Sequence, residues 1–419
     1  MAPSSPQVAI TGIGVVSPFG VGRDTFWRAV SEGRSGTRAI DRFDASDLLC
    51  RVAAAVPDND VAVALEAMSL EGRSDPKRMA RVSQIAVIAA REAMDDAGLT
   101  EAGDEGLGVL VGSGAGGIDV GERQYGDYYS GERHRVSPYA IPLSVVGMVS
   151  SEISIALGLR GASHVMSTGC TSSTDAIGYA ANLIRHGEVD AIVTGGADAC
   201  VTPGMIFGFT RMRVVSTAFN DRPAEASRPF DGDRDGFVLG EGAWMLTLER
   251  LDRARARGAR VYATVDGYAS TCDAYHRVQM DPEGNEIVRA MRLALSKARV
   301  APEELGYVNY HGTSTRLNDA VEMRCVQRVL GERAMHVPGS STKSMIGHPQ
   351  GASGAAGVVT TALAIAHGLL PPTINQVTPD PECELDVIPN VARRQEVDAA
   401  LCNCLGFGSK NSALVLRRR

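Results

Sequence analysis

The stretch from His164 to Thr194 decides the fold of this chain, because it reads as a strand, a helix and a second strand in succession. It begins His164-Val-Met-Ser-Thr-Gly-Cys-Thr-Ser-Ser173, where a short apolar run gives way to small and hydroxyl-bearing residues. Apolar side chains then recur at the spacing of one helix face, at Ile177, Ala180, Ala181 and Ile184. Ala191-Ile-Val-Thr194 returns to a strand pattern. This alternation predicts an α/β fold with a mixed or parallel sheet.

The alternation continues on both sides of this stretch. Strands are predicted at Val8–Val16, Gly108–Gly112, Tyr307–Tyr310, Leu401–Leu405 and Ser412–Leu416, and helices at Ile85–Ala97 and Ile287–Ala298. Ile184-Arg-His-Gly187 is echoed about half a chain later by Ile365-Ala-His-Gly368. The echo suggests two related halves; the alternative is chance similarity between two amphipathic helices.

Composition and charge narrow the function classes. Hydrophobic residues make up 44% of the 419 residues and charged residues 22%, the balance of a soluble globular protein. The formal net charge is −7 with no long basic run, so no nucleic-acid partner is expected. The 8 cysteines form no CxxC pair and no histidine pair has zinc spacing, which predicts no metal site and a reducing compartment. Met1–Gln7 has no signal-peptide pattern, so we expect a cytoplasmic protein.

Gly351–Leu370 is the one segment that imitates a membrane span. It is built from alanine and glycine rather than leucine and phenylalanine, it stops at Pro371-Pro372, and no basic cluster flanks it. We therefore predict a buried helix within a large domain, and no membrane association.

Ser167–Ser173 is the first of four segments with residues suited to chemistry. Small residues turn the chain here, and a helix is predicted to begin at or just after Cys170. A thiol at a helix N-terminus meets the positive end of the dipole, which lowers its pKa, and free N–H groups there can hold an oxyanion. The sequence predicts Cys170 as a nucleophile; the alternative is a buried structural cysteine.

Two further segments place histidines beside small polar residues. His311 leaves a strand and is followed by a glycine and three hydroxyl residues that can bind a polar ligand or cap the next helix. His348 precedes the long apolar helix, whose dipole should keep the ring neutral. Lys343 lies in apolar surroundings and is expected to pair with Glu322. The alternatives are a satisfied loop histidine and a solvated loop lysine.

The fourth segment, Cys402–Asn411, has glycines around Phe407. Their backbone N–H groups can approach a ligand, and Phe407 is placed to act as a gate; the alternative is a tight turn between two closing strands. Together, one cysteine, two histidines and one lysine, each beside small residues, match a cysteine nucleophile assisted by two neutral histidines.

At these residues the chain resembles the β-ketoacyl-[acyl-carrier-protein] synthases, the condensing enzymes of fatty acid and polyketide assembly. The resemblance runs from Val8 to Leu416. Four motifs occur in the family's order and spacing: Thr-Gly-Cys-Thr-Ser, His-Gly-Thr-Ser-Thr, Thr-Lys-Ser-Met-Ile-Gly-His and Gly-Phe-Gly. Ser227–Asp231, Arg234–Val238 and Gly240–Gly242 add three further family stretches.

The resemblance implies the thiolase fold: α/β, with two βαβαβαββ halves in a five-layered αβαβα sandwich. We expect residues 1–260 to form the N-terminal half and residues 261–419 the C-terminal half. It implies no metal and no organic cofactor, because the substrates are carried on the phosphopantetheine of an acyl carrier protein. It also implies a dimer, formed either by identical chains or with a chain-length-factor homologue.

Carried over by position, Cys170 is implied to take an acyl group as a thioester. Malonyl carrier protein then loses CO2 and the enolate attacks that thioester, while His311 and His348 assist decarboxylation and stabilise the enolate oxygen. The backbone N–H groups of Cys170 and Phe407 would form the oxyanion hole. The supporting residues are Lys343, Glu322 and Asp319 for the polar network, Thr313 and Thr315 for pantetheine, and Ala115 and Phe209 for the acyl pocket.

Departures from the family pattern bear on the substrate. Ala115 stands where many fatty acid enzymes carry a bulkier aliphatic residue, which suggests a deeper or wider acyl tunnel. Ser409-Lys410 replaces the usual Gly-Thr after Gly-Phe-Gly. Ser167–Cys170, Arg316–Asp319 and Thr378–Asp386 look more like the catalytic ketosynthase subunits of dissociated (type II) polyketide systems. We therefore favour polyketide or polyene elongation over housekeeping fatty acid elongation.

Carrier protein is strongly acidic and so is this chain, so docking should need a local basic patch rather than net charge. By their positions in the family pattern, the candidates for this basic patch are Lys77, Arg78, Arg81, Arg211 and Arg213. The alternative is a solvated charged face.

Two other functions stay open. Cys404-Leu-Gly-Phe-Gly408 fits the C-x-G-x-G pattern of thiolases, which act on coenzyme A thioesters but lack the His-Gly-Thr-Ser-Thr segment. A non-catalytic chain-length partner is the other alternative. Such subunits typically lack the cysteine, whereas Cys170 and both histidines are present here.

Overall fold

Two sets of five strands with the same order and direction form the framework of the protein. The computed structural model describes residues 6–68, 70, 74–99 and 106–419. The N-terminal set lies in the order β6-β5-β7-β8-β1. Its strands are β1 (Val8–Ser17), β5 (Gly108–Gly112), β6 (Ser163–Met166), β7 (Ala191–Ala199) and β8 (Leu239–Arg250).

The C-terminal set repeats this order as β11-β10-β14-β15-β9. In each set the first strand along the chain is antiparallel to the fifth, the fifth is antiparallel to the fourth, and the second, third and fourth run parallel. The same order and direction occurring twice confirms the predicted duplication. The strands are β9 (Ala263–Cys272), β10 (Tyr307–Asn309), β11 (Gly339–Ser340), β14 (Ala399–Gly406) and β15 (Lys410–Arg417).

The two sets meet along one short antiparallel pairing between β1 and β9, in which Val8 lies opposite Val265. The predicted division at residue 260 falls between α9 (Leu251–Ala256) and β9. No observation tests that boundary as a domain limit, so it stays a prediction.

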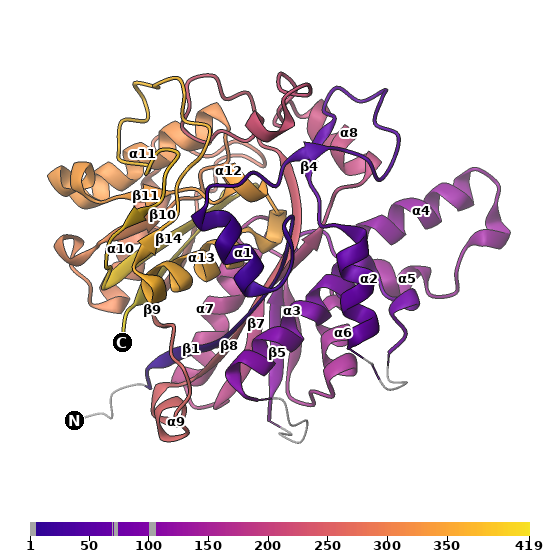
Figure 1. The fold of residues 1–419 in the computed structure, drawn as a ribbon, viewed down its shortest axis with the longest axis horizontal. Coiled ribbons are helices and arrows are strands. Elements are labelled where there is room, and N and C mark those ends of the chain that lie inside the picture. The colour runs from indigo at the N-terminus through magenta and orange to yellow at the C-terminus, as the bar shows by residue number, and fades with distance from the viewer. Residues whose placement is uncertain (1–5, 69, 71–73, 100–105) are drawn as a thin grey trace.

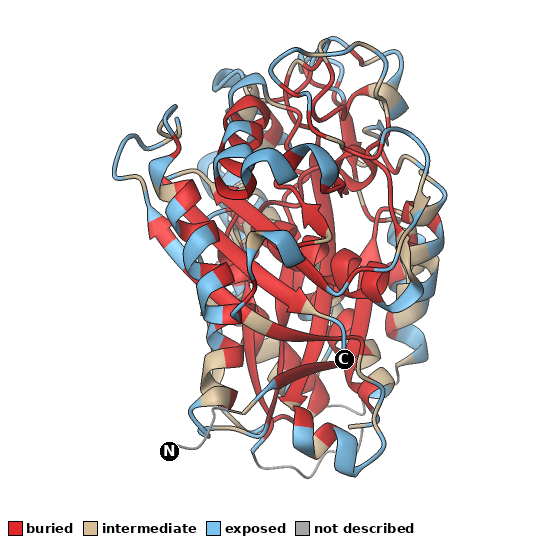
Figure 2. Ribbon diagram, turned by 90° about the vertical axis from the view of Figure 1, so that its left-hand side faces the viewer, coloured by how far each residue is buried: buried red, intermediate tan, exposed pale blue. Residues whose placement is uncertain are grey.

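Helices form three layers around the two sets of strands (Figure 1). α7 (Ser172–Arg185) and α13 (Ser353–His367) pack against each other between the sets. α3 (Arg81–Ala97) covers the N-terminal strands and α10 (Asn285–Ala298) covers the C-terminal strands. This is the five-layered arrangement expected of the thiolase fold. Figure 2 shows the strands and central helices buried, with exposed faces on the outer helices.

The apolar segment that resembles a membrane span is the central helix α13. Every residue from Ser353 to Ile365 is buried, and a 3-10 turn at 350–352 precedes the helix. Among the described residues, no helix is long and apolar enough to cross a bilayer. Small residues are required because α7 lies so close: a Cβ on Gly354 would fall 1.9 Å from the Thr174 hydroxyl oxygen.

The remaining elements surround this core. A helical arm, α4 (Ile118–Tyr129) and α5 (Ala140–Ser144), projects from the body on the right of Figure 1. The other helices are α1 (Arg23–Ser31), α2 (Asp58–Ala67), α6 (Met148–Leu157), α8 (Pro203–Arg211), α11 (Arg316–Leu330) and α12 (Lys343–Ile346). Short strands complete the structure: β2 (Gly20–Val21), β3 (Arg38–Ala39), β4 (Val52–Ala54), β12 (Leu369–Leu370) and β13 (Arg393–Arg394).

Candidate active site

Cys170 lies in the turn between β6 and α7, two residues before the helix begins, with 5% of its surface exposed. The preceding Gly169 has a φ of +71°, which suits glycine at this sharp turn. Hydroxyl groups close the turn: Ser172 Oγ accepts the backbone N–H of Thr168 at 2.8 Å, and the Thr168 hydroxyl donates to the Asp175 carboxylate at 2.6 Å. The small polar residues around Cys170 therefore hold its side chain in place.

Two histidines from the C-terminal half line the same pocket as this thiol. His348 Nε2 lies 3.1 Å from Cys170 Sγ. The rings of His311 and His348 meet edge to face, with centroids 5.4 Å apart. The backbone N–H of His348 donates to the Val238 carbonyl oxygen at 2.7 Å. The edge-to-face Phe237 and His348 rings have centroids 5.3 Å apart. The structure thus brings together the three residues singled out from separate sequence segments.

Both imidazoles are neutral at physiological pH. The pKa of His311 and that of His348 lie well below the usual value of 6.5, mainly because both rings are buried. The nearby positive charge of Lys343 lowers both pKa values further. The expectation of a neutral ring at His348 agrees with this direction. Burial dominates, however, rather than the helix dipole on which the expectation rested.

The expected thiolate at Cys170 is wrong. Burial, followed by the neighbouring Cys404, raises the pKa of Cys170 to about 12, although a backbone hydrogen bond from Phe407 and the charge of Lys343 act to lower it. Desolvation disfavours the charged form more than one helix terminus favours it. Burial therefore favours the neutral thiol of Cys170, and Nε2 of His348, 3.1 Å away, lies within reach of its proton.

Lys343 and Glu322 form no direct salt bridge in the described chain, but their charges interact as expected. The positive charge of Lys343 acts to lower the pKa of Glu322, and the negative charge of Glu322 acts to raise the pKa of Lys343. The Glu322 oxygens accept the backbone N–H groups of His311 at 2.7 Å and Gly312 at 2.8 Å, and the Asn403 amide at 3.2 Å. Burial raises the pKa of Glu322 to about 7. Glu322 therefore shapes the turn that carries His311, while burial lowers the pKa of Lys343.

Asp319 supports the next residues of the same loop. It accepts the backbone N–H of Thr313 at 3.0 Å and that of Phe230 at 2.9 Å, and Arg234 lies 3.5 Å from it. Arg234 also pairs with Asp380.

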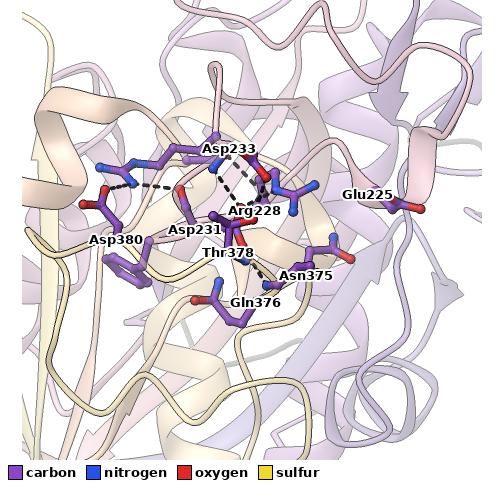
Figure 3. Close-up of polar contacts among 12 residues, drawn as sticks. Glu225, Arg228, Asp231, Asp233, Asn375, Gln376, Thr378 and Asp380 are labelled. Carbon is purple, nitrogen blue, oxygen red and sulfur yellow. Dashed lines mark hydrogen bonds and ion pairs between the residues drawn. The ribbon is translucent and has the colours of Figure 1, made fainter.

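A second carboxylate, Asp231, anchors the surrounding loops (Figure 3). Its oxygens accept the Nε–H of Arg228 at 2.9 Å and the backbone N–H groups of Val377 and Thr378, each at 2.7 Å. The Thr378 hydroxyl in turn donates to Asp233 at 2.6 Å. The family-like stretches at 227–238 and 378–386 therefore act as a frame behind the histidine loop.

The backbone of Phe407 lies against that of Cys170. A Cβ on Gly406 would fall 3.3 Å from the Cys170 nitrogen, and a Cβ on Gly169 would fall 3.5 Å from the Phe407 carbonyl oxygen. The two predicted oxyanion donors are thus neighbours. Ser409 has a φ of +63°, and its hydroxyl oxygen accepts the backbone N–H of His276 at 3.1 Å. This hydrogen bond links the loop after Phe407 to the segment around His276.

A pocket of about 330 Å³ leads to Cys170. It is lined by His311, His348, Phe407, and the two threonines predicted for pantetheine, Thr313 and Thr315, whose hydroxyl oxygens lie 2.9 Å apart.

The two residues predicted for the acyl pocket lie behind this lining. The Phe209 ring packs between two other aromatic rings. Its centroid lies 5.3 Å from that of Phe237 and 6.5 Å from that of Phe407. Ala115 belongs to the same hydrophobic cluster as Phe209. Neither residue lines the pocket itself, so their role in holding an acyl chain stays a prediction.

The five basic residues suggested for carrier protein do not share one environment. Arg213 lines the catalytic pocket, and Arg211 is exposed nearby at the end of α8. Lys77 lines a different cavity, and exposed Arg78 stacks on the Tyr139 ring at 5.8 Å. Arg81 lines the same cavity as Lys77, and its guanidinium pairs with the fully buried Glu241 at 3.2 Å and with Asp58 at 2.8 Å. The docking role of the five residues stays a prediction.

Sequence reasoning missed two residues at the site. Buried Asp198, at the end of β7, accepts the backbone N–H groups of Gly114 and Ala115 and, across the interface between the halves, that of Gly351. Burial raises its pKa to about 6. Cys404 places its sulfur 3.1 Å from the Cys170 carbonyl oxygen. Only spatial proximity reveals either role; in the sequence, the thiolase-like spacing was the one signal for Cys404. Among the described residues, no cluster of His, Cys, Asp and Glu is arranged to hold a metal.

Comparison with known proteins agrees with this geometry. Residues 5–254 match the family model "Beta-ketoacyl synthase, N-terminal domain" and residues 262–377 match "Beta-ketoacyl synthase, C-terminal domain". The chain is 42% identical over 414 residues to a 3-oxoacyl-[acyl-carrier-protein] synthase 2 of Synechocystis sp., with 98% of each chain covered. It is also 42% identical to the tetracenomycin polyketide synthase ketoacyl synthase alpha subunit of Streptomyces glaucescens, covering 98% of this chain and 97% of the relative.

A solved structure has the same fold over nearly the whole chain. The ishigamide ketosynthase/chain length factor superposes with a TM-score of 0.91 at 35% identity, covering 99% of this chain and 100% of that one. Matched family models over most of the length, close relatives and a shared fold lead to one assignment: the chain belongs to the β-ketoacyl synthase family and is an acyltransferase.

Proposed function

We propose that this protein extends acyl chains by decarboxylative condensation with malonyl-[acyl-carrier-protein], using Cys170 as its nucleophile. The observation that carries the proposal is the 3.1 Å contact between Cys170 Sγ and His348 Nε2 at the end of a pocket that also exposes His311. The curated relatives are named for the same class of reaction, in fatty acid and in polyketide synthesis.

Acylation is the first step. As Cys170 Sγ attacks the acyl thioester of the carrier protein, His348 Nε2 takes the thiol proton. The bond between the acyl carbon and the pantetheine sulfur breaks, and His348 returns the proton to the departing thiolate. The backbone N–H groups of Cys170 and Phe407 stabilise the tetrahedral oxyanion, which is most effective in a closed, dry site.

Condensation follows. Malonyl carrier protein loses its carboxylate as CO2, and the electron pair left behind forms an enolate. Its oxygen accepts an N–H from His311 and, after the ring proton of His348 has exchanged through solvent from Nδ1 to Nε2, an N–H from His348. The α-carbon attacks the Cys170 thioester, a carbon–carbon bond forms, and the sulfur leaves as a thiolate that takes a proton from solvent. Neutral imidazoles suit this step, because each can donate one N–H to the developing negative charge.

We infer a polyketide or polyene chain rather than a housekeeping fatty acid as the product. Supporting this are the small Ala115, the type II-like segments and two structural neighbours: the ishigamide ketosynthase/chain length factor, and a type II PKS ketosynthase bound to a hexaketide and its acyl-carrier protein, at 30% identity and a TM-score of 0.89. The 3-oxoacyl-[acyl-carrier-protein] synthases among the relatives keep housekeeping fatty acid elongation as the alternative.

The test is mass spectrometry and CO2 release. Incubation with acyl carrier protein should leave an acyl adduct on Cys170, and adding malonyl carrier protein should release CO2 and yield the extended product. Cys170→Ala should show no adduct and no product. Acetyl exchange with coenzyme A without CO2 would instead identify a thiolase, and an unmodified wild-type protein would identify a non-catalytic partner.

Carrier protein would dock at the pocket entrance. Arg213 lines the pocket and Arg211 is exposed next to it, so an acidic partner could bring its pantetheine arm directly toward Thr313 and Thr315.

We further propose that the protein works as a dimer with a second ketosynthase-like chain. β6 is the last strand of its set, so one edge of it has no hydrogen-bonding neighbour among the described strands. The α4–α5 arm exposes apolar side chains, among them Tyr129 at 81% and Ile141 at 60%. A relative is itself a ketosynthase/chain length factor.

Native mass spectrometry of the chain alone and co-expressed with a cysteine-less homologue separates homodimer from heterodimer. Tyr129→Glu with Ile141→Glu should yield monomer. Val391→Glu, which adds charge at an apolar side chain 75% exposed elsewhere, should leave the assembly unchanged. A monomeric wild-type protein in both preparations would overturn the proposal.

A further inference from the structure

A second cavity, of about 1060 Å³, lies at the end of α7 that is farthest from Cys170. The ends of α7, α9 and α10 line it, together with β9 and the end of β15. Cys170 precedes the first residue of α7 and Arg185 is its last residue, so the length of the helix separates this cavity from the thiol by about 20 Å. None of the lining residues takes part in the proposed condensation or belongs to β6 or the α4–α5 arm.

The lining of this cavity is basic, although the chain as a whole has a formal net charge of −7. Seven of the lining residues are lysine or arginine, and two are aspartate. Both aspartates already pair with arginines: Asp252 with Arg250 at 2.6 Å, and Asp266 with Arg419 at 2.8 Å. The carboxylates in the cavity therefore leave most of its positive charge unbalanced.

Four of the lining cations have no carboxylate partner among the residues that the structure describes. A fifth, Arg417, pairs with Glu304 at 2.9 Å, outside the lining. The four come from three helices that are far apart in the sequence and converge on one cavity: Arg185 of α7, Arg255 of α9, and Lys297 and Arg299 at the end of α10. This convergence distinguishes them from a row of charges along one solvated helix face.

The half-buried Arg185 shows that this positive charge lacks a counter-charge. Its guanidinium donates to the Val265 carbonyl oxygen, and Lys297 Nζ donates to the Tyr268 carbonyl oxygen at 2.9 Å. Both acceptors are uncharged backbone groups of β9. Burial lowers the pKa of Arg185, although the charge of Asp266 acts to raise it. A partly buried cation without an anionic partner is costly, and a bound anion would remove that cost.

We propose that this cavity binds a small molecule that carries a diphosphate group, such as inorganic pyrophosphate or a nucleoside triphosphate. Four unpaired cations match an anion with several negative charges, and guanidinium groups bind phosphate oxygens through paired N–H donors. The volume of about 1060 Å³ is more than a single phosphate needs, and it reaches the upper end of the range for small-molecule sites. This site does not depend on the proposed condensation.

Isothermal titration calorimetry of the full chain in phosphate-free buffer at low salt tests the proposal with two probes, pyrophosphate and ATP. Both should bind, and sulfate should bind at least tenfold more weakly. Arg255→Gln with Arg299→Gln should weaken both probes by about 10- to 100-fold, because two charge-assisted contacts are lost. Both side chains are exposed, so this double variant should unfold at the wild-type temperature. Arg185→Gln should weaken binding by a similar factor.

Arg160→Gln with Arg333→Gln is the matched control, because it removes two charges from exposed residues that do not line the cavity. Its affinity for both probes should equal that of the wild type. Equal affinities for pyrophosphate and ATP would assign the site to the diphosphate group, and tighter binding of ATP would assign it to nucleotides. Failure of both probes to bind at millimolar concentration, or equal weakening by the control pair, would overturn the inference. Neither result would alter acylation of Cys170, which tests the proposed function separately.

Discussion

Replacing His348 with alanine should slow acylation of Cys170 by about 100- to 10,000-fold, the range contributed by a positioned general base. The reason is the protonation state of the thiol. Since burial raises the pKa of Cys170 to about 12, very little thiolate exists at neutral pH, and the attacking sulfur depends on the imidazole 3.1 Å away to take its proton. The measurement is the rate of adduct formation by rapid-quench mass spectrometry.

The pH dependence of this rate provides an independent check. The pKa of His348 lies well below 6.5, so the wild-type rate should show no inflection near pH 6.5, where an exposed histidine would lose its basic form. His186→Ala is the control, because that side chain is 69% exposed at the far end of α7. An unchanged rate in His348→Ala, or an inflection near pH 6.5 that this substitution removes, would contradict the base as assigned.

Replacing Gly354 with alanine should lower the free energy of unfolding by about 1–3 kcal/mol, the usual cost of adding a methyl group to a filled core. The added Cβ would lie 1.9 Å from Thr174 Oγ1 and 2.8 Å from Thr174 N, so a backbone atom blocks it as well as a side chain. α7 and α13 would have to separate, and Cys170 would move away from His348 with the start of α7. Urea unfolding measures the first effect and the acylation rate the second.

Gly126→Ala is the matched control for this substitution. Gly126 also lies inside a helix, α4, but no heavy atom comes within 4 Å of the added Cβ. There the substitution should stabilise the protein by about 0.5–1 kcal/mol, because alanine loses less conformational freedom than glycine in a helix. Equal unfolding curves for Gly354→Ala and the wild type would contradict the prediction, because they would mean that α7 and α13 accommodate the added methyl group without cost.

Much of the fold was predictable because its signals are local. The predicted helix at Ile85–Ala97 appears as α3, extended one turn to Arg81, since a helix start is set by weak capping preferences. The echo between residues 184–187 and 365–368 marks equivalent ends of α7 and α13. The helix α4 was not predicted, because its buried residues, Val120, Gly121 and Gln124, are few and include a glycine and a polar side chain, so they give no clear apolar period in the sequence.

The chemistry of the site was predictable in its members but not in its electrostatics. Cys170, His311 and His348 each stand beside small residues, a local pattern, and they meet in space. The protonation of Cys170 depends on how completely both halves bury it, which no single segment encodes. Likewise, Glu322 turns toward backbone N–H groups rather than Lys343, because a loop that carries His311 has donors to satisfy. The roles of these residues await the measurements above.

The matching strand order of the two halves brings the N-terminal ends of two equivalent helices, α7 and α13, together where the halves meet. One half supplies the thiol of Cys170, and the other supplies both imidazoles. Neither half holds the full set of side chains by itself, so the proposed chemistry requires both halves in one fold.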